Sequence, residues 1–298
     1  MTAKALVTGL RGFTGRYMAR ELSAMGYQVV SLSGRGIEDA ESSELDLRDR
    51  VAVNSAVTAI QPEVVVHLAA VAYVAHGDVN NIYTSNIVGS RNLLSALAGC
   101  DKPPKKILLA SSANVYGNAR MPTLDETCPA RPENDYAISK YAMELMARQY
   151  RDDLPITIAR PFNYTGVGQS PEFLLPKLVR HFAQRAPTVE LGNIDVYRDF
   201  NDVRMVAAVY GRLLEKGESG EIYNVCTGAA YSIRDVLGIL ADLVGYSIEV
   251  IVNPSFVRDN EVKRLVGSNR KLVECIGKIS QIPLNETLEW MYRDLTDR

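Results

Sequence analysis

The chain has 298 residues, of which 47% are hydrophobic and 23% charged. This composition is typical of a globular protein with one large domain or two smaller ones, and it excludes a disordered, collagen-like or disulfide-stapled chain. The 33 basic residues nearly balance the 35 acidic ones, so no overall charge favours nucleic acid or an anionic membrane as a partner. An anionic ligand would have to be held by local groups.

The apolar runs are shorter than the roughly 18 to 20 residues that span a bilayer, and His67 interrupts the run at 62–72. Residues 1–8 favour a strand over a signal peptide, because only a short apolar stretch precedes Gly9. We therefore expect a cytoplasmic protein without a membrane partner. Four widely spaced cysteines and three histidines show no metal-ligand spacing, so we expect free thiols and no metal site.

Short β-branched runs alternate with helical stretches through the first 165 residues. The predicted strands are 3–8, 28–32, 64–68, 107–111 and 156–159, and the predicted helices are 15–25, 48–60, 86–98 and 136–150. Strands that are apolar along their whole length and alternate with helices are typical of a parallel sheet covered on both faces. We predict an α/β fold with a doubly wound, Rossmann-type sheet.

This rhythm changes after Pro161, where a stretch rich in Gly, Asn and Pro begins. We predict two domains, each assembled from separated segments. Residues 1–165 and 195–226 would form the dinucleotide-binding domain, and residues 166–194 and 227–298 a smaller substrate-binding domain. The further predicted helices are 173–184, 204–214, 233–244 and 287–295, and the further strands are 188–191, 221–225 and 247–252.

A glycine-rich turn, Thr8-Gly9-Leu10-Arg11-Gly12-Phe13-Thr14-Gly15, connects the first strand to the first helix. Glycines permit a tight turn and a close approach of backbone N–H groups, and a helix N-terminus supplies partial positive charge for a pyrophosphate. Spaced glycines alone also occur in purely structural turns. Their position here, after a strand and before a helix, indicates a dinucleotide-binding site.

Tyr136 and Lys140 are four residues apart, so they share one face of the helix 136–150. About 0.5 such pairs are expected by chance from the composition, so the spacing needs support from its context. This Tyr-x-x-x-Lys is the only one in the chain, and it lies 24 residues after Ser112, which follows the strand 107–111. Ligands of doubly wound sheets bind at the carboxyl ends of the strands, where Ser112 and this helix could converge. The alternative is a turn serine and two surface residues.

With these motifs the chain resembles the extended short-chain dehydrogenase/reductases that act on nucleotide-activated sugars. Within that family, Ala-Arg-Pro-Phe-Asn at 159–163, Gly-Val-Gly-Gln at 166–169 and Tyr-Asn-Val-Cys-Thr-Gly at 223–228 look most like the GDP-4-dehydro-6-deoxy-D-mannose reductases. The resemblance covers essentially the whole length and is carried by Gly9, Gly12, Gly15, Asp46-Leu47, His67-Leu68-Ala69-Ala70, Asn86, Ser112, Tyr136, Lys140 and Arg198-Asp199-Phe200.

The resemblance implies a bound nicotinamide dinucleotide. Asp46 and Leu47 would flank its adenine, the Leu-Ala-Ala segment 68–70 its central part, and Phe162 its nicotinamide, while Lys140 would bind the nicotinamide ribose. The cofactor-binding residues implied are Gly9, Arg11, Gly12, Phe13, Thr14, Gly15, Arg35, Asp46, Leu47, Leu68, Ala69, Ala70, Asn86, Tyr136, Lys140 and Phe162.

The resemblance also implies a GDP-sugar as substrate. Lys177, Arg198 and Arg258 are candidates for its diphosphate, because basic side chains, and arginine above all, bind phosphate oxygens. Taken singly, such residues are more often solvated surface charges. The full set of implied substrate contacts is Asn114, Asn163, Lys177, Arg198, Arg258 and Glu261, with Asn163 beside the diphosphate and Glu261 near the ribose.

The implied reaction is reduction of a keto group at C4 of the sugar. Tyr136 would give the proton and Ser112 would hydrogen-bond the same oxygen. Phenolate chemistry near neutral pH calls for a lowered phenol pKa, and we expect the Lys140 cation to lower it, where a shift of ~3 units corresponds to about 4 kcal/mol.

Related dehydratases carry an acid where this chain has Asn114, and an amide cannot exchange a proton at neutral pH, so dehydration is disfavoured. The reductases also often have an acid near this point, so Asn114 is a departure from them as well. Two alternatives stay open at this point: a nucleotide-sugar 4-epimerase with tightly bound NAD, and a redox-sensing regulator without catalysis. The intact Ser112, Tyr136 and Lys140 set argues against the regulator.

The strand 28–32 is followed by Ser33-Gly34-Arg35, and the next acid is Glu38. No carboxylate therefore stands where one would repel a 2′-phosphate, whereas Arg35 or Arg11 could bind it. We predict a preference for NADP(H), with NAD(H) also accepted. The helices 86–98 and 136–150 resemble those that pair across a two-fold axis in this family, which predicts a homodimer.

Overall fold

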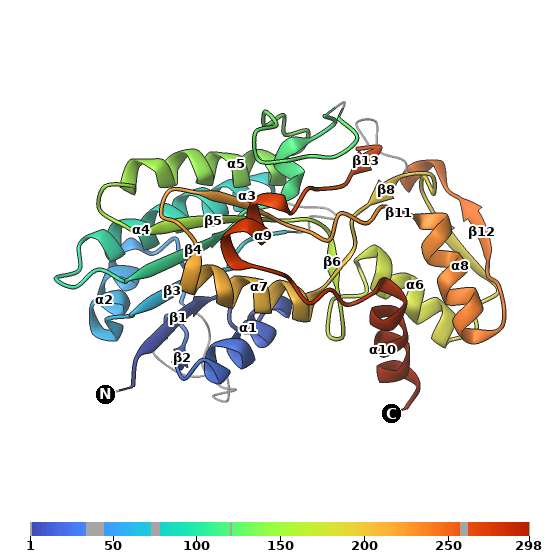
Figure 1. Cartoon of the computed structure of the whole chain (residues 1–298), viewed down its shortest axis with the longest axis horizontal. Coiled ribbons are helices and arrows are strands. Elements are labelled where there is room, and N and C mark those ends of the chain that lie inside the picture. Colours follow the sequence, from blue (N-terminus) through green and yellow to red (C-terminus); the bar gives the residue numbers. More distant parts are fainter. Residues whose placement is uncertain (1, 34–44, 73–77, 120, 257–261, 298) are drawn as a thin grey trace.

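A six-stranded parallel sheet lies at the centre of the larger part of the molecule, with the spatial order β10-β5-β4-β3-β1-β2 (Figure 1). The computed structural model describes residues 2–33, 45–72, 78–119, 121–256 and 262–297. The strands are β1 (Lys4–Thr8), β2 (Gln28–Val30), β3 (Val64–His67), β4 (Lys106–Ala110), β5 (Ile156–Pro161) and β10 (Ile222–Val225). The chain runs outward from β1 to β2 and then in the opposite direction through β3, β4 and β5, so the predicted doubly wound sheet is confirmed.

Side chains of the central strands alternate between two hydrophobic cores, one on each face of the sheet. In β1, Val7 belongs to one core and Leu6 to the other; in β3, Val66 and Val65 divide in the same way. Successive side chains of a strand point to opposite faces, so strands buried on both sides are apolar at every position. This explains why the sequence shows continuous apolar runs instead of alternating ones.

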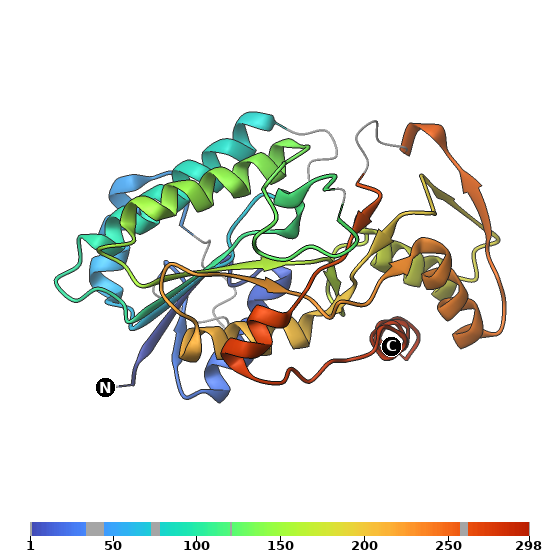
Figure 2. The same ribbon diagram turned by 45° about the horizontal axis from the view of Figure 1, so that its top comes forward.

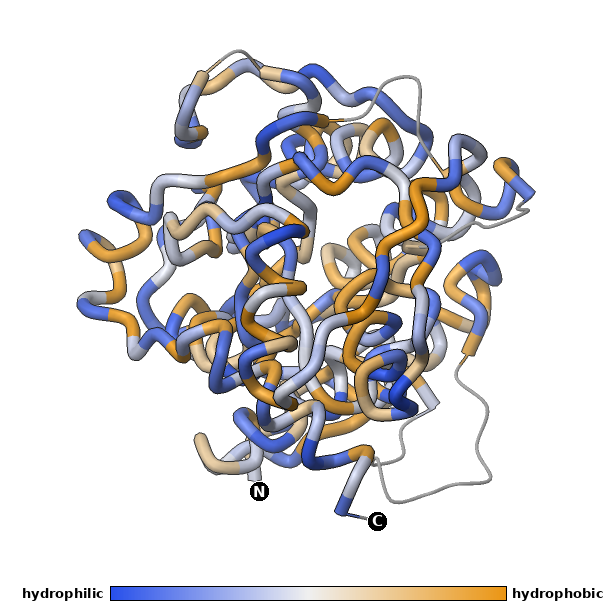
Figure 3. Tube along the Cα trace, turned by 90° about the vertical axis from the view of Figure 1, so that its right-hand side faces the viewer, coloured by the Kyte–Doolittle hydropathy of each residue, from blue (hydrophilic) through white to orange (hydrophobic). Residues whose placement is uncertain are grey.

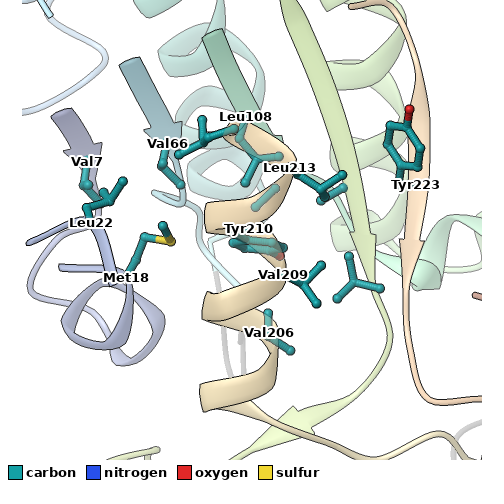
Figure 4. Close-up of a cluster of buried hydrophobic side chains, with 14 of the residues drawn as sticks. Val7, Met18, Leu22, Val66, Leu108, Val206, Val209, Tyr210, Leu213 and Tyr223 are labelled. Atoms are coloured by element: carbon teal, nitrogen blue, oxygen red, sulfur yellow. The ribbon is translucent and has the colours of Figure 1, made fainter. Parts of the chain in front are cut away.

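Within the described residues, helices cover both faces of the sheet (Figures 1 and 2). The first face carries α1 (Phe13–Ala24), α7 (Val203–Lys216) and α9 (Arg270–Ile276), and the second α2 (Arg50–Ile60), α4 (Ser90–Ala98) and α5 (Asp135–Ala147). Figure 4 shows α1 and α7 contributing Met18, Leu22, Val209 and Tyr210 to the first core, beside Val7 of β1.

A smaller part of the molecule lies beyond the carboxyl end of β5 and is built around α6 (Leu174–Ala183), α8 (Ile233–Val244) and α10 (Leu284–Thr296). Seen from this side, the helices show both hydrophobic and hydrophilic colours along their length, as expected of helices with one buried face (Figure 3). Its core includes Leu178, Phe182, Leu240 and Leu288. The short strands here are β6 (Tyr164–Thr165), β7 (Thr188–Leu191), β8 (Tyr197–Arg198), β9 (Asn201–Asp202), β11 (Tyr231–Ser232), β12 (Glu249–Val252) and β13 (Arg264–Leu265).

The packing differs from the predicted domain boundary in two segments. Val196 and Phe200, expected in the larger domain, belong to the core of the smaller part. Residues 227–298 were all expected in the smaller domain, but α9 packs on α7 and β10, and its Leu272 and Ile276 belong to a core of the large sheet. A seven-residue helix carries too little periodicity to show which domain it covers.

The helix predicted at 86–98 also begins earlier than expected. A short helix α3 (Val79–Tyr83) continues into a π-helical turn (Thr84–Gly89) and then into α4. Among the described residues, no helix combines the length and apolar character needed to cross a membrane.

Candidate active site

The glycine turn has a backbone shape that side chains would block. Gly9 has φ +70°, and a Cβ there would lie 3.0 Å from the backbone nitrogen of Ala69. A Cβ on Gly15 would lie 2.3 Å from the carbonyl oxygen of Gly9. The N-cap of α1, Gly12, offers no side chain to the first N–H groups of the helix, so these donors stay available to an anion. This geometry fits the pyrophosphate of a dinucleotide.

A cleft of about 1130 Å³ begins at this turn and extends past Ser112 and Tyr136 to the start of α6. Its volume leaves room for a dinucleotide together with a second ligand. Most residues predicted to bind cofactor or substrate line it, namely Gly9, Arg11, Gly12, Phe13, Thr14, Gly15, Leu68, Ala69, Ala70, Ser112, Asn114, Tyr136, Lys140, Phe162 and Asn163.

A smaller cavity of about 210 Å³ adjoins the cleft and contains the two residues predicted to flank the adenine, Asp46 and Leu47. The Arg48 guanidinium pairs with Asp46 (Nη2 to Oδ2, 2.6 Å), and the backbone nitrogen of Arg48 donates to Oδ1 at 2.9 Å. These hydrogen bonds lower the pKa of Asp46, so its carboxylate is charged and fixed in direction near neutral pH.

Ser112, Tyr136 and Lys140 converge at the carboxyl ends of β4 and β5. Asn134 accepts a hydrogen bond from the Ala137 N–H (2.9 Å) and thereby starts α5 immediately before Tyr136. One turn later the Lys140 ammonium donates to the Ala110 carbonyl at the end of β4 (2.7 Å) and lies 6.0 Å from the centre of the Tyr136 ring. The predicted convergence of the three side chains is thus observed.

The electrostatics of Tyr136 differ from the expectation. Burial raises the pKa of its phenol, repulsion from Tyr164 raises it further, and the hydrogen bond with Ser112 lowers it only in part. Lys140 does not contribute to the shift of this pKa, so the expected lowering is not observed. Burial lowers the pKa of Lys140 itself to about 8, while Glu144 partly offsets this. Tyr136 therefore keeps its proton at neutral pH, which is the state required of a proton donor.

A buried ion pair anchors α5 one turn beyond Lys140. Arg160 of β5 donates two hydrogen bonds to Glu144, from Nε at 2.9 Å and from Nη2 at 2.6 Å, and the Ser111 hydroxyl donates a third at 2.5 Å. Both side chains are almost fully buried, with 4% and 0% exposed. The sequence analysis missed Glu144, although its position at i+4 from Lys140 placed it on the same face.

A second residue missed from the sequence, Tyr164, ties the glycine turn to the smaller part of the molecule. Its hydroxyl and that of Thr14 are 2.8 Å apart, and its ring stacks on Phe13 with a centroid distance of 6.0 Å. Tyr164 lines the cleft and raises the pKa of Tyr136, so it lies within electrostatic reach of the Tyr136 phenol.

Asn86, predicted to bind the cofactor, lies behind the cleft wall. It is 1% exposed, and its side-chain amide bonds the backbone of Val71 in both directions (2.8 and 3.2 Å) and the Ser139 hydroxyl (3.0 Å). Asn86 therefore supports the residues around the cofactor site and makes these bonds within the protein.

Two predicted phosphate-binding residues do not line the described part of the cleft. The Lys177 ammonium donates to the Glu190 carbonyl at 2.8 Å, and Arg198 donates to the Tyr197 carbonyl at 2.9 Å. Three further predicted residues, Arg35, Arg258 and Glu261, lie outside the described residues.

Comparison with known proteins now identifies the family. The model for the "NAD dependent epimerase/dehydratase family" matches residues 5–226. The chain belongs to this family. GDP-6-deoxy-D-talose 4-dehydrogenase of Aggregatibacter actinomycetemcomitans is 32% identical over 98% of this chain and 97% of its own length. GDP-6-deoxy-D-mannose reductase of Pseudomonas aeruginosa is 33% identical over 100% and 99%, respectively.

Solved structures agree with this assignment. A protein of Burkholderia cenocepacia, provisionally named an epimerase, has a TM-score of 0.92 and 49% identity, with 99% of both chains covered. The structure of RMD from Pseudomonas aeruginosa in complex with NADPH has a TM-score of 0.87 and 31% identity, with both chains fully covered. The predicted membership of the extended short-chain dehydrogenase/reductases is confirmed, and with it a nicotinamide-dependent enzyme of nucleotide sugars.

Proposed function

We propose that this enzyme reduces the C4 keto group of a GDP-4-keto-6-deoxyhexose with a nicotinamide cofactor, in the synthesis of deoxysugars for surface polysaccharide. The observation that carries the proposal is the convergence of Ser112, Tyr136 and Lys140 on a cleft that starts at the glycine turn. The two relatives that match over nearly the whole chain support it, since both are named for GDP-6-deoxyhexoses.

Tyr136, Ser112 and Lys140 have different roles in the proposed reduction of the keto group. A nicotinamide cofactor held by the glycine turn and Lys140 would supply the hydride to C4. Tyr136, whose raised pKa keeps the phenol protonated, donates the proton to the oxygen, and Ser112 orients that oxygen by a hydrogen bond. The Lys140 ammonium, whose pKa burial lowers to about 8, would hold the nicotinamide ribose.

Asn114 lines the cleft two residues after Ser112, and its backbone nitrogen donates to the Ser112 hydroxyl at 3.1 Å. An amide at this place can position a substrate oxygen, but it cannot take or give a proton at neutral pH. This supports a reductase over a dehydratase.

For the cofactor we propose a preference for NADP(H), with NAD(H) also accepted. The Ser31 and Ser33 hydroxyls are 2.7 Å apart at the end of β2, where an NAD-specific sheet would carry an acid. The similarity to a structure solved with NADPH supports this preference.

The competing function is a nucleotide-sugar 4-epimerase. The similar Burkholderia structure, which is provisionally named an epimerase, supports this alternative. An epimerase uses the same three residues but retains its cofactor and consumes none. We expect the purified enzyme to lose its cofactor on gel filtration, and to oxidise NADPH only when GDP-4-keto-6-deoxymannose is supplied. The NMR spectrum of the product would also show whether the manno or the talo sugar forms. Retained NAD and epimerised product without NADPH consumption would contradict the reductase.

We further propose that the enzyme is a cytoplasmic homodimer whose partners meet through α4 and α5. The outer surfaces of the π-helical turn and of α5 leave apolar side chains exposed, with Val88 45%, Ile138 40% and Leu145 43% exposed. Two copies of this surface could form a four-helix bundle. Light scattering at micromolar concentration should give about twice the chain mass of 32.8 kDa; a species of chain mass alone would contradict the dimer.

A further inference from the structure

A chain of buried hydrogen bonds runs beneath the cleft, from the glycine-turn strand to the catalytic helix. At its centre is His67, the last residue of β3, which is 1% exposed. Its Nδ1 lies 2.7 Å from the Thr8 hydroxyl, and its Nε2 lies 2.7 Å from the Ser90 hydroxyl. Thr8 also accepts a hydrogen bond from the Ala69 N–H (3.2 Å), at the wall of the cleft.

The donors and acceptors of the hydrogen bonds nearest Tyr136 can be assigned, because some of the groups can only donate or only accept. The carbonyl of Tyr136 can only accept, so the Ser139 hydroxyl donates to it (2.8 Å). The Ser139 oxygen then accepts from the Asn86 amide NH₂ (3.0 Å). The orientation of that amide is fixed, because its oxygen accepts from the Val71 N–H.

The same reasoning assigns the tautomer of His67. The backbone carbonyl of Asn86 can only accept, so the Ser90 hydroxyl donates to it (2.6 Å). The remaining partner of Ser90 is His67 Nε2, which must therefore carry the hydrogen and donate. In a neutral ring Nδ1 is then an acceptor, and the Thr8 hydroxyl donates to it.

We propose that His67 is a positioning residue: an uncharged, Nε2-protonated imidazole that holds the backbone of Tyr136 through Ser90, Asn86 and Ser139, and the Ala69 backbone through Thr8. It touches neither reacting atom, but it ties the floor of the cofactor site to the turn that carries the proton donor. The catalytic part of this inference rests on the proposed role of Tyr136.

Burial supports the uncharged state. It lowers the pKa of His67 to about 3, and the nearby Lys140 ammonium acts in the same direction. A neutral ring with one donor and one acceptor matches its two neighbours, whereas a charged ring would place a second N–H against the Thr8 oxygen and an unpaired charge in the core. The unbroken set of partners distinguishes this histidine from a merely buried one.

The tautomer can be observed directly by ¹H–¹⁵N NMR, because the chain has only three histidines. We expect His67, identified by loss of its signals in His67→Gln, to show the Nε2–H pattern unchanged from pH 5 to 8. His181 offers an internal contrast, since its Nδ1 faces the Lys177 carbonyl at 2.8 Å and must itself carry a hydrogen. An Nδ1–H tautomer, or titration of His67 in this range, would overturn the proposal. This measurement needs no substrate.

Kinetics test the link to Tyr136. We expect Ser90→Ala and Ser139→Ala each to lower kcat about tenfold, while KM for NADPH and sugar changes less than about twofold, because small displacements of a catalytic group lower the rate of the chemical step. Ser95→Ala is the matched control, since Ser95 lies on α4 outside this network, and we expect its kcat to be unchanged.

The outcomes separate the two proposals. Full kcat in a folded Ser139→Ala variant, or a rise in KM without loss of kcat, would overturn the positioning role. If Ser90→Ala does not fold, Ser139→Ala still decides, because it removes only the last link. Failure of the wild type to reduce the keto sugar would reject the proposed function, and the NMR measurement would still accept or reject the His67 assignment.

Discussion

The polar groups buried behind the sheet side of the cleft and the basic residues of the smaller part of the molecule are held in different ways. On the sheet side, Glu144 and Arg160 are buried, and several hydrogen bonds join them to neighbouring strands. In the smaller part, the predicted phosphate ligands Lys177 and Arg198 donate to the backbone carbonyls of Glu190 and Tyr197.

This difference reflects two physical requirements. Proton transfer and cofactor binding need fixed geometry, which buried networks supply at the cost of desolvating every member. Basic residues that bind a diphosphate can stay partly solvated until the ligand arrives, since their charge is not costly in water. We therefore expect substitutions on the sheet side to have large effects and those of the basic residues in the smaller part small ones.

The largest effect is expected from Glu144→Gln. This change leaves the Arg160 guanidinium buried without its charged partner, which costs about 3–5 kcal/mol of the free energy of unfolding. Urea titration with circular dichroism measures it. The matched control is Glu215→Gln on the exposed side of α7, expected within about 0.5 kcal/mol of the wild type. A Glu144→Gln protein as stable as this control would show that the buried pair contributes little.

Tyr136→Phe comes next. Removing the phenol hydroxyl takes away the proton donor but leaves the ring, so we expect kcat to fall by about 10²-fold or more while affinity for the nucleotide sugar hardly changes. Steady-state NADPH oxidation measures kcat, and calorimetry measures the affinity for the nucleotide sugar. Tyr150→Phe, near the end of the same helical segment, should behave as the wild type. An active Tyr136→Phe enzyme would reject the catalytic assignment.

Arg35→Ala tests the preference for NADPH that was predicted from the sequence. If Arg35 bonds the 2′-phosphate, the change should cost about 1.5 to 3 kcal/mol of NADPH binding and almost none of NADH binding. Fluorescence titration with both cofactors separates the two effects, and Arg50→Ala, at the exposed start of α2, is the control. Equal losses for the two cofactors, or a wild type that prefers NADH, would show that the phosphate site is elsewhere.

The pH profile tests the buried lysine. Because burial lowers the pKa of Lys140 from its usual value to about 8, its proton is lost as the pH rises through that value. We expect kcat/KM to fall above about pH 8, approaching tenfold per pH unit. Glu144 raises this pKa, so the fall should begin at lower pH in Glu144→Gln, at a temperature where that variant is folded. A flat profile to pH 10 would mean that the charge of Lys140 is not required.

The smallest effect is expected from Lys177→Met. The Lys177 ammonium already bonds the Glu190 carbonyl and lies 5.1 Å from the centre of the Phe256 ring, so any contribution to substrate binding replaces existing contacts. We expect KM for the GDP-sugar to rise less than about fivefold, equivalent to about 1 kcal/mol, with kcat unchanged. A hundredfold rise would instead show that Lys177 reaches the diphosphate and would restore the original prediction.

Much of the sheet side was predictable because its signals are local. The glycine turn, the apolar strands and the Tyr136–Lys140 spacing each occupy a few consecutive residues, so chain order alone placed them. Tyr164 and Glu144 were missed for the opposite reason, since their partners Thr14 and Arg160 are distant in sequence or on another element. Nothing in the local pattern distinguishes a buried glutamate of a helix from a solvated one.

The sequence alone determined the fold class and the spacing of Ser112, Tyr136 and Lys140, because backbone periodicity and side-chain spacing depend on neighbours along the chain. Only the tertiary structure decided the charge states and partners: burial raised the pKa of Tyr136 where a lowered one was expected, and hydrogen bonds fixed the buried amide of Asn86 between Val71 and Ser139. Desolvation and hydrogen bonding depend on every group that surrounds an atom in space. Those groups come from strands and helices far apart in the sequence, and folding brings them together.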